Sequence, residues 1–257
     1  MKWIFKMGLI LCLVFVFHKV LEPTYTIDLN HLISFYTNEY TGIQNNQSLL
    51  VHQIHNESEI LEVSKKKIYI YNTHQKEQYQ SGSVMDASVY LKELLENKGY
   101  EVYFETSDFD LYKKTHNMDL TETYPTSRIF LEENVTSNGP FDLIIDLHRD
   151  ALNREDCFYL DNHKAYAKMM MVIGGDSSFR DTVIYNSSIL HETIDELCAG
   201  VMRSDFIRNS AVYNQDYTDK MMLIEVGGQH STFQEVKNSV ELLCQAIDIC
   251  LKEGKFV

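Results

Sequence analysis

The sequence has few cysteines, and they are not arranged for cross-linking or for a structural metal site. Five cysteines are spread over 257 residues, and no Cys-x-x-Cys pair occurs. This arrangement excludes a disulfide framework as the basis of so long a chain, and it excludes a thiol-based zinc or redox motif. We therefore interpret the cysteines as small buried hydrophobic residues.

Positive charge is also scarce, because 23 Lys and Arg residues stand against 37 Asp and Glu residues, a formal net charge of -14. Nucleic acids are bound by neutralising their phosphates with Lys and Arg, so this balance excludes a nucleic-acid partner and favours a neutral or cationic one. The composition, with 44% hydrophobic and 23% charged residues, predicts one main globular domain.

A hydrophobic run at residues 7–17 follows Lys2 and Lys6 and precedes Lys19, which is the pattern of a membrane-targeting segment. The run is shorter than the roughly 20 residues of a comfortable span, so residues 1–22 are predicted to be a membrane anchor or a signal segment. No small-x-small cleavage site follows, which favours an uncleaved single-pass anchor. The basic residues at its N-terminal side place the remaining chain outside the cytoplasm.

The remaining chain divides near residue 65. Residues 23–64 are mostly polar and weakly periodic, which predicts an extracytoplasmic tether. After them, strand-like and helix-like segments alternate: strands at 68–71, 100–104, 141–147, 167–173 and 221–226, and helices at 84–97, 124–135, 189–201 and 233–251. This alternation indicates an α/β fold over residues 65–257, a three-layer domain with a largely parallel sheet.

Three of these predicted strands end in polar side chains. His74 and Glu77 follow the first strand, His148 lies among acidic residues at the end of another, and Glu225 closes the last. In parallel sheets ligands bind beyond the carboxyl ends of the strands, so these groups are expected to converge at one edge. Two imidazoles and several carboxylates are the donors that a catalytic zinc ion requires.

Each of these residues also has an ordinary structural explanation. His74 alone could be a turn residue, His148 and its flanking acids could be a surface ion-pair cluster, and Glu225 could pair with a buried arginine. The conjunction of all three favours a metal site, because an ionised carboxylate within so apolar a segment is costly to bury without a cation or a function.

The motifs that carry these residues resemble a known family. They read YNTHQKEQY, FDLIIDLHRDA, VIGGD and VYNQDYTDKMMLIEVGG, in that order, and a Ser127-Arg128 pair precedes the second. From residue 67 onward they resemble the stage II sporulation protein P family, the membrane-anchored peptidoglycan hydrolases of endospore-forming Firmicutes. The resemblance implies a zinc-dependent N-acetylmuramoyl-L-alanine amidase fold, with endopeptidase activity also attributed to the family. It implies a lytic transglycosylase and a membrane protein as partners during engulfment.

The resemblance also implies roles for individual residues. His74 and His148 match the two histidine ligands of the zinc ion, and Glu225 matches the catalytic glutamate. Glu77 matches the third ligand of the THxxE pattern. In related amidases the acidic ligand starts the next helix, so Asp86 remains the alternative.

Further residues are expected around this centre. Arg149 and Asp150 are expected to orient His148 or to bind substrate carboxylates. Three residues of the YNQD motif are expected to line the groove, unless the motif only shapes a loop: Asn214, Gln215 and Asp216. The alternative for the whole protein is a non-hydrolytic wall-binding or assembly module, and a third possibility is a zinc peptidase acting on cross-links.

Overall fold

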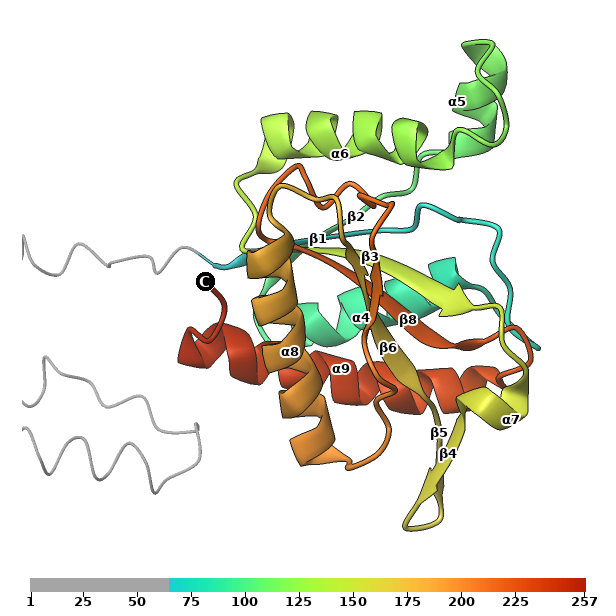
Figure 1. The fold of residues 1–257 in the computed structure, drawn as a ribbon, viewed down its shortest axis with the longest axis vertical. Coiled ribbons are helices and arrows are strands. Elements are labelled where there is room, and N and C mark those ends of the chain that lie inside the picture. Colours follow the sequence, from blue (N-terminus) through green and yellow to red (C-terminus); the bar gives the residue numbers. More distant parts are fainter. Residues whose placement is uncertain (1–64) are drawn as a thin grey trace, which may run out of the picture. The chain divides into compact units, whose positions relative to one another are not determined.

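The computed structural model describes residues 65–257 (Figure 1). The predicted anchor at 1–22 and tether at 23–64 lie outside the described residues, and these domain boundaries stay predictions. Among the helices of residues 65–257, none is both long and apolar enough to cross a membrane.

A six-stranded sheet forms the centre of the described domain, in the order β2-β1-β3-β8-β6-β7. All neighbouring strands run parallel except β6, which is antiparallel to β8. This confirms the predicted largely parallel sheet. The strands are β1 (Lys67–Tyr71), β2 (Glu101–Phe104), β3 (Leu143–Asp150), β6 (Met169–Gly174), β7 (Phe206–Arg208) and β8 (Met221–Gly228).

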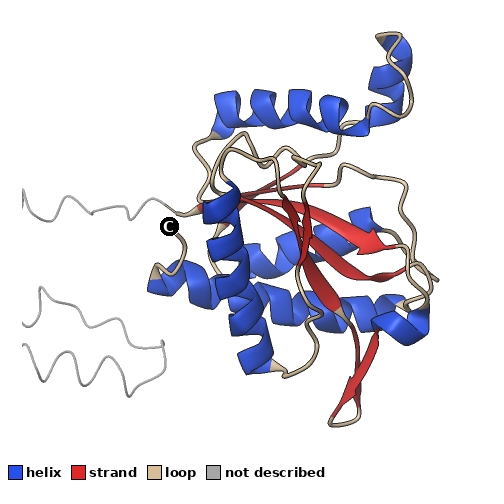
Figure 2. Cartoon of the chain, in the orientation of Figure 1, coloured by secondary structure: helices blue, strands red, loops and turns tan. Residues whose placement is uncertain are grey.

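Helices cover both faces of this sheet, so the domain has three layers (Figure 2). One face packs against α4, α8 and α9, and its core contains Ile68 and Ile70. The other face packs against α6, and its core contains Tyr69 and Tyr71. This alternation follows from the two-residue period of a strand. The helices are α4 (Val84–Asn97), α5 (Phe109–Thr115), α6 (Thr123–Asn138), α7 (Arg154–Cys157), α8 (Arg180–Leu197) and α9 (Phe233–Glu253).

Two of the helices on this sheet, α4 and α9, begin at capping boxes. At α4, Ser83 accepts from the backbone of Asp86, and the Asp86 carboxylate accepts from the backbone of Ser83. At α9, Thr232 and Glu235 form the same reciprocal pair. Each box satisfies two backbone N–H groups that the helix leaves free, and this fixes where the helix starts.

The structure differs from the sequence-based expectation mainly in its short elements. Strand β3 runs to Asp150, three residues beyond the predicted end, so His148 lies within the strand rather than after it. Helix α5, strand β7 and the hairpin of β4 (Phe158–Asp161) and β5 (Lys164–Ala167) were not predicted. Their patterns are too short to show a helical or strand period.

Candidate active site

The three strands that carry the predicted site residues are immediate neighbours. Strands β1, β3 and β8 run parallel, so their carboxyl ends meet at one edge of the sheet. The register pairs His148 of β3 with Glu225 of β8. Registered neighbours in parallel strands direct their side chains to the same face, here the face that α6 covers.

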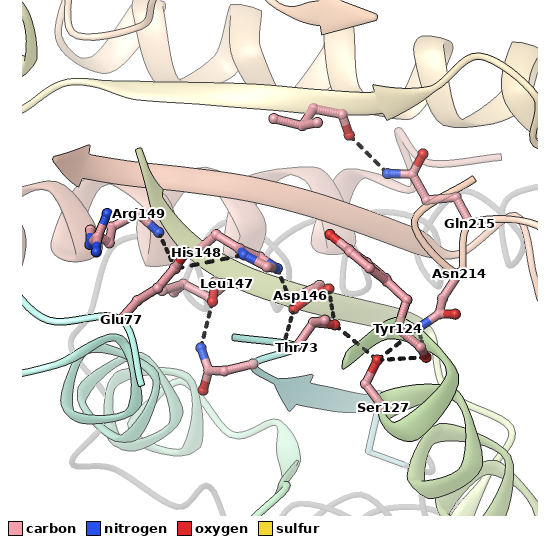
Figure 3. A network of polar contacts seen from close by, with 12 residues as sticks. Thr73, Glu77, Tyr124, Ser127, Asp146, Leu147, His148, Arg149, Asn214 and Gln215 are labelled. Atoms are coloured by element: carbon pink, nitrogen blue, oxygen red, sulfur yellow. Dashed lines mark hydrogen bonds and ion pairs between the residues drawn. The ribbon is translucent and has the colours of Figure 1, made fainter. Parts of the chain in front are cut away.

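The side chains after β1 approach this pair. The ring centroids of His74 and His148 are 5.2 Å apart, in an edge-to-face arrangement. The Glu77 carboxylate lies 3.7 Å from His148 Nδ1 and accepts a 3.1 Å hydrogen bond from the backbone N–H of Arg149 (Figure 3). The structure therefore brings His74, Glu77, His148 and Glu225 to one edge of the sheet.

Asp146 is the residue that joins the two histidine-bearing segments, and the sequence pattern assigns it no specific role. It is fully buried and accepts two hydrogen bonds from Thr73, from the backbone N–H at 2.9 Å and from the hydroxyl at 2.7 Å. Its other contact is with His148 Nε2 at 2.8 Å, out of line for a hydrogen bond. Asp146 stands two residues before His148 in the same strand, and this spacing is the signal that could have found it.

The electrostatics of the site follow from burial among acidic groups. Burial raises the pKa of Glu225 to about 7, against the opposing effect of His148. Burial lowers the pKa of His148, but the negative charges of Asp146, Glu77 and Glu225 outweigh this effect and raise the pKa to about 9. Burial and the neighbouring His148 lower the pKa of His74. A carboxylate poised near neutral pH suits proton transfer, and the surplus of acids favours a cation among them.

The two alternatives for the third acidic ligand have different surroundings. The Asp86 carboxylate accepts two 2.8 Å hydrogen bonds from Ser83 at the start of α4 and is exposed. Glu77 is directed toward His148 instead. Its 3.7 Å separation from His148 Nδ1 is close to the distance of about 3.3 Å between two ligands of one tetrahedral zinc ion. The geometry therefore favours Glu77.

Arg149 and Asp150, at the end of β3, bind residues of two other segments. Arg149 Nε donates to the carbonyl of Gln78 at 3.0 Å. Asp150 accepts a 2.6 Å hydrogen bond from Arg203, a residue that sequence reasoning missed because it lies far away in the chain, just before β7. These contacts link the end of β3 to the segment that follows β1 and to the segment that precedes β7.

The YNQD motif holds a loop rather than presenting side chains to a groove. Gln215 is fully buried, and its amide accepts from Gly174 N–H at 2.7 Å and donates to Val172 O at 2.8 Å. Asn214 is buried and donates to Ser127 Oγ at 3.0 Å, while Asp216 pairs with Arg128 at 2.9 Å. Asn214 and Gln215 are buried and bonded within the protein, and the exposed Asp216 is paired with Arg128, so the structure favours the loop-shaping alternative.

The residues present fit a zinc ion in donor chemistry. Two imidazoles and one carboxylate form an N₂O ligand set with room for a water in a catalytic site. One buried polar atom at this edge, Glu225 Oε2, has no hydrogen-bond partner within residues 65–257. As the side chains stand in this part of the chain, no group of three His, Cys, Asp or Glu residues is close enough to hold an ion.

The fold defines the class of the domain. It is similar to the structure of the CwlD amidase from Clostridioides difficile in complex with the GerS lipoprotein, with a TM-score of 0.50 and 17% identity, over 74% of this chain and 98% of that one. It also matches the N-acetylmuramoyl-L-alanine amidase AmiC2 of Nostoc punctiforme at a TM-score of 0.43 and 12% identity, over 74% of this chain and 97% of that one. The described domain has an amidase-like α/β fold.

The family follows from the sequence. The family model of Stage II sporulation protein P (SpoIIP) matches residues 25–248, and the chain belongs to this family. This confirms the resemblance drawn from the motifs. The Stage II sporulation protein P of Bacillus subtilis (strain 168) is 25% identical over 194 residues, which cover 68% of this chain and 48% of that protein. The chain thus spans about half the length of this curated relative.

Proposed function

We propose that the protein is a peptidoglycan hydrolase of sporulation, an N-acetylmuramoyl-L-alanine amidase that cleaves the amide between the lactyl group of the glycan and the L-alanine of the stem peptide. The observation that carries the proposal is the meeting of His74, Glu77, His148 and Glu225 at the ends of three neighbouring parallel strands. The family match and the amidase-like fold support it.

His74, Glu77 and His148 are the residues that would hold a zinc ion. When bound there, zinc supplies two effects: it lowers the pKa of a coordinated water toward about 7 and it polarises a carbonyl group. Asp146 contacts the far nitrogen of His148, Nε2, and so turns Nδ1 toward Glu77. A carboxylate behind a ligating histidine orients the ring and makes it a stronger ligand.

Glu225 provides the proton transfers of the reaction. Its carboxylate takes a proton from the attacking water, whose oxygen forms the new bond to the lactyl carbonyl carbon. Glu225 then delivers that proton to the alanine nitrogen as the C–N bond breaks, which leaves a lactyl carboxylate and a free amino group. Its pKa of about 7 suits both directions of transfer near neutral pH.

The location and partners proposed for this chain follow from its family and its N-terminal sequence. We place the catalytic domain outside the cytoplasm, with residues 1–22 as a single-pass anchor in the cell membrane. Peptidoglycan is the substrate. A lytic transglycosylase and membrane proteins of the sporulation machinery are the proposed protein partners, since a glycan stripped of stem peptides is the substrate that a transglycosylase would consume.

The variant Glu225→Gln tests this function. It removes the proton acceptor but keeps the shape of the side chain, so the full chain should retain about one zinc per molecule and lose at least about 100-fold in peptidoglycan cleavage. Glu192→Gln, an exposed position on α8, is the matched control and should behave as wild type. Cleavage by Glu225→Gln at the wild-type rate would contradict the assignment.

The alternative function is a wall-binding module without hydrolysis. It is favoured by one observation, the lack of a closed three-residue metal group within residues 65–257. Metal analysis of the purified full chain distinguishes the two functions. Stoichiometric zinc and inhibition by a chelator support the amidase, whereas a metal-free chain that binds peptidoglycan equally with and without chelator supports the binding module.

A further inference from the structure

Tyr124 is an aromatic residue over the site that neither the motifs nor the proposed chemistry uses. It lies in the first turn of α6, and its ring packs edge-on against His74 with centroids 5.8 Å apart. Figure 3 shows its phenol directed from α6 toward His148, above Asp146. Helix α6 thus places a hydroxyl group against the same edge of the sheet that carries the predicted ligands.

The phenol of Tyr124 is available as a hydrogen-bond donor. Within residues 65–257 no protein group forms a hydrogen bond with its hydroxyl. Burial raises the pKa of Tyr124, and so do the charges of Asp146, Tyr213, Glu225 and Glu77, so the phenol keeps its proton at neutral pH. A tyrosine hydroxyl in a partly buried site normally finds a partner, so one without a protein partner is suited to a ligand.

A polar network holds Tyr124 in this position. Its backbone carbonyl accepts from Ser127 Oγ at 3.1 Å and from Asn214 Nδ2 at 3.5 Å. Ser127 Oγ lies 3.0 Å from Thr73 Oγ1, and the Thr73 hydroxyl donates its proton to Asp146 at 2.7 Å. The start of α6 is thereby connected to the residue that precedes His74. This gives two motif residues without a catalytic role, Ser127 and Asn214, a physical reason to be present.

We propose that the Tyr124 phenol donates a hydrogen bond to the carbonyl oxygen of the scissile amide, as this oxygen gains negative charge. The proposal rests on the proposed amidase function and deepens it. The phenol keeps its proton throughout, so no bond to Tyr124 forms or breaks. A donor held rigidly where charge develops stabilises the transition state more than the bound substrate, so its loss should appear in kcat rather than in KM.

The variant Tyr124→Phe removes only the hydroxyl and keeps the ring against His74. With the zinc-loaded full chain and a soluble muramoyl peptide, we expect kcat to fall by about 10- to 100-fold while KM stays within about threefold. Tyr185→Phe, on an exposed part of α8, is the matched control and should leave both constants unchanged. An unchanged kcat in Tyr124→Phe, with active wild type, overturns the proposal.

A second measurement is independent of turnover. In full-length Glu225→Gln labelled with ¹³Cζ-tyrosine, the Tyr124 resonance is assigned by its loss in the Tyr124→Phe, Glu225→Gln double variant. Adding N-acetylmuramoyl-L-alanyl-D-isoglutamine, which carries the scissile amide, should shift this resonance and leave that of Tyr185 in place. No shift at saturating probe overturns the contact with Tyr124. If the resonance shifts but the wild-type chain cleaves no substrate, the amidase function is overturned and the contact with Tyr124 stands.

Discussion

Asp146 shows how a single buried side chain can set the geometry of the whole site. It is 0% exposed, it accepts hydrogen bonds from the backbone N–H and the hydroxyl of Thr73, and it contacts the ring of His148. One carboxylate thus fixes the residue that precedes His74 and orients the second histidine. Removing its charge should affect both histidines at once.

We expect Asp146→Asn to weaken zinc binding by about 10- to 100-fold, because a carboxylate behind a histidine ligand strengthens it. It should also lower the free energy of unfolding by about 1–3 kcal/mol, since an amide cannot accept all the contacts of the carboxylate. Zinc titration and urea denaturation measure the two effects. Asp181→Asn, at an exposed position of α8, is the control. Wild-type zinc affinity in Asp146→Asn would contradict this role.

Among individual residues, the sequence identifies site candidates that lie in or shortly after a predicted strand. His74 and Glu77 were found because they follow an apolar strand, and His148 and Glu225 because each is a polar residue within an apolar strand. Their ligand and catalytic roles stay predictions. Asp146 could have been found from its spacing in β3, but Tyr124 and Arg203 could not be assigned from the sequence. Their positions depend on how α6 crosses the sheet and on how distant loops pair, which local pattern does not encode.

At the scale of elements, the start of α4 shows which of two roles Asp86 has, a capping residue or a metal ligand. Asp86 stands where related amidases are expected to carry their acidic ligand, yet its carboxylate completes the capping box with Ser83. A carboxylate used in a cap stabilises its helix and is not free to act as a ligand of the proposed zinc ion.

We expect Asp86→Ala to lower the free energy of unfolding by about 1 kcal/mol, because a capping contact is lost. Its zinc content and rate of cleavage should equal those of wild type, whereas Glu77→Ala should lose zinc. Thermal unfolding and metal analysis of both variants test the distinction. If Asp86→Ala lost zinc and Glu77→Ala retained it, Asp86 rather than Glu77 would be the acidic ligand.

Helix α4 was predictable from its pattern, whereas α5 and the bounds of α8 were not. Helix α4 was predicted with the bounds that the structure has, because its apolar spacing spans four turns and Gly99 follows it. Helix α5 has only 7 residues, and the apolar face predicted for α8 includes Leu197, which is 38% exposed, and Val201, which lies beyond the helix end. In such segments tertiary packing outweighs local periodicity.

For the whole domain, the end of α9 is tied to the neighbouring helix and to the sheet through Asp248. Its carboxylate pairs with Lys98 at 3.2 Å and with Lys252 at 2.9 Å, and it accepts a 2.9 Å hydrogen bond from the phenol of Tyr100. Burial raises the pKa of Asp248, but hydrogen bonds from Lys252, Tyr100 and Lys98 outweigh burial and lower it.

This shift predicts a pH-dependent contribution to stability. A carboxyl group with a lowered pKa in the folded state stabilises it above the unfolded-state pKa of about 3.9, and this contribution is lost as pH falls through the folded-state value. Asp248→Asn should therefore be less stable than wild type at pH 7, by about 1–2 kcal/mol. The difference should shrink as pH falls below about 4. Denaturation curves at both pH values measure it, and an equal difference at pH 7 and at acid pH would contradict the assignment.

Hydrolysis of the bond between the lactyl group and L-alanine is tested most directly by mass spectrometry of peptidoglycan digested by the full chain in ¹⁸O-labelled water. We expect free stem peptides that begin with unlabelled L-alanine, and one ¹⁸O atom in the lactyl carboxylate of the glycan. Label found in a peptide carboxylate instead, or an undigested polymer with zinc-loaded protein, would contradict it.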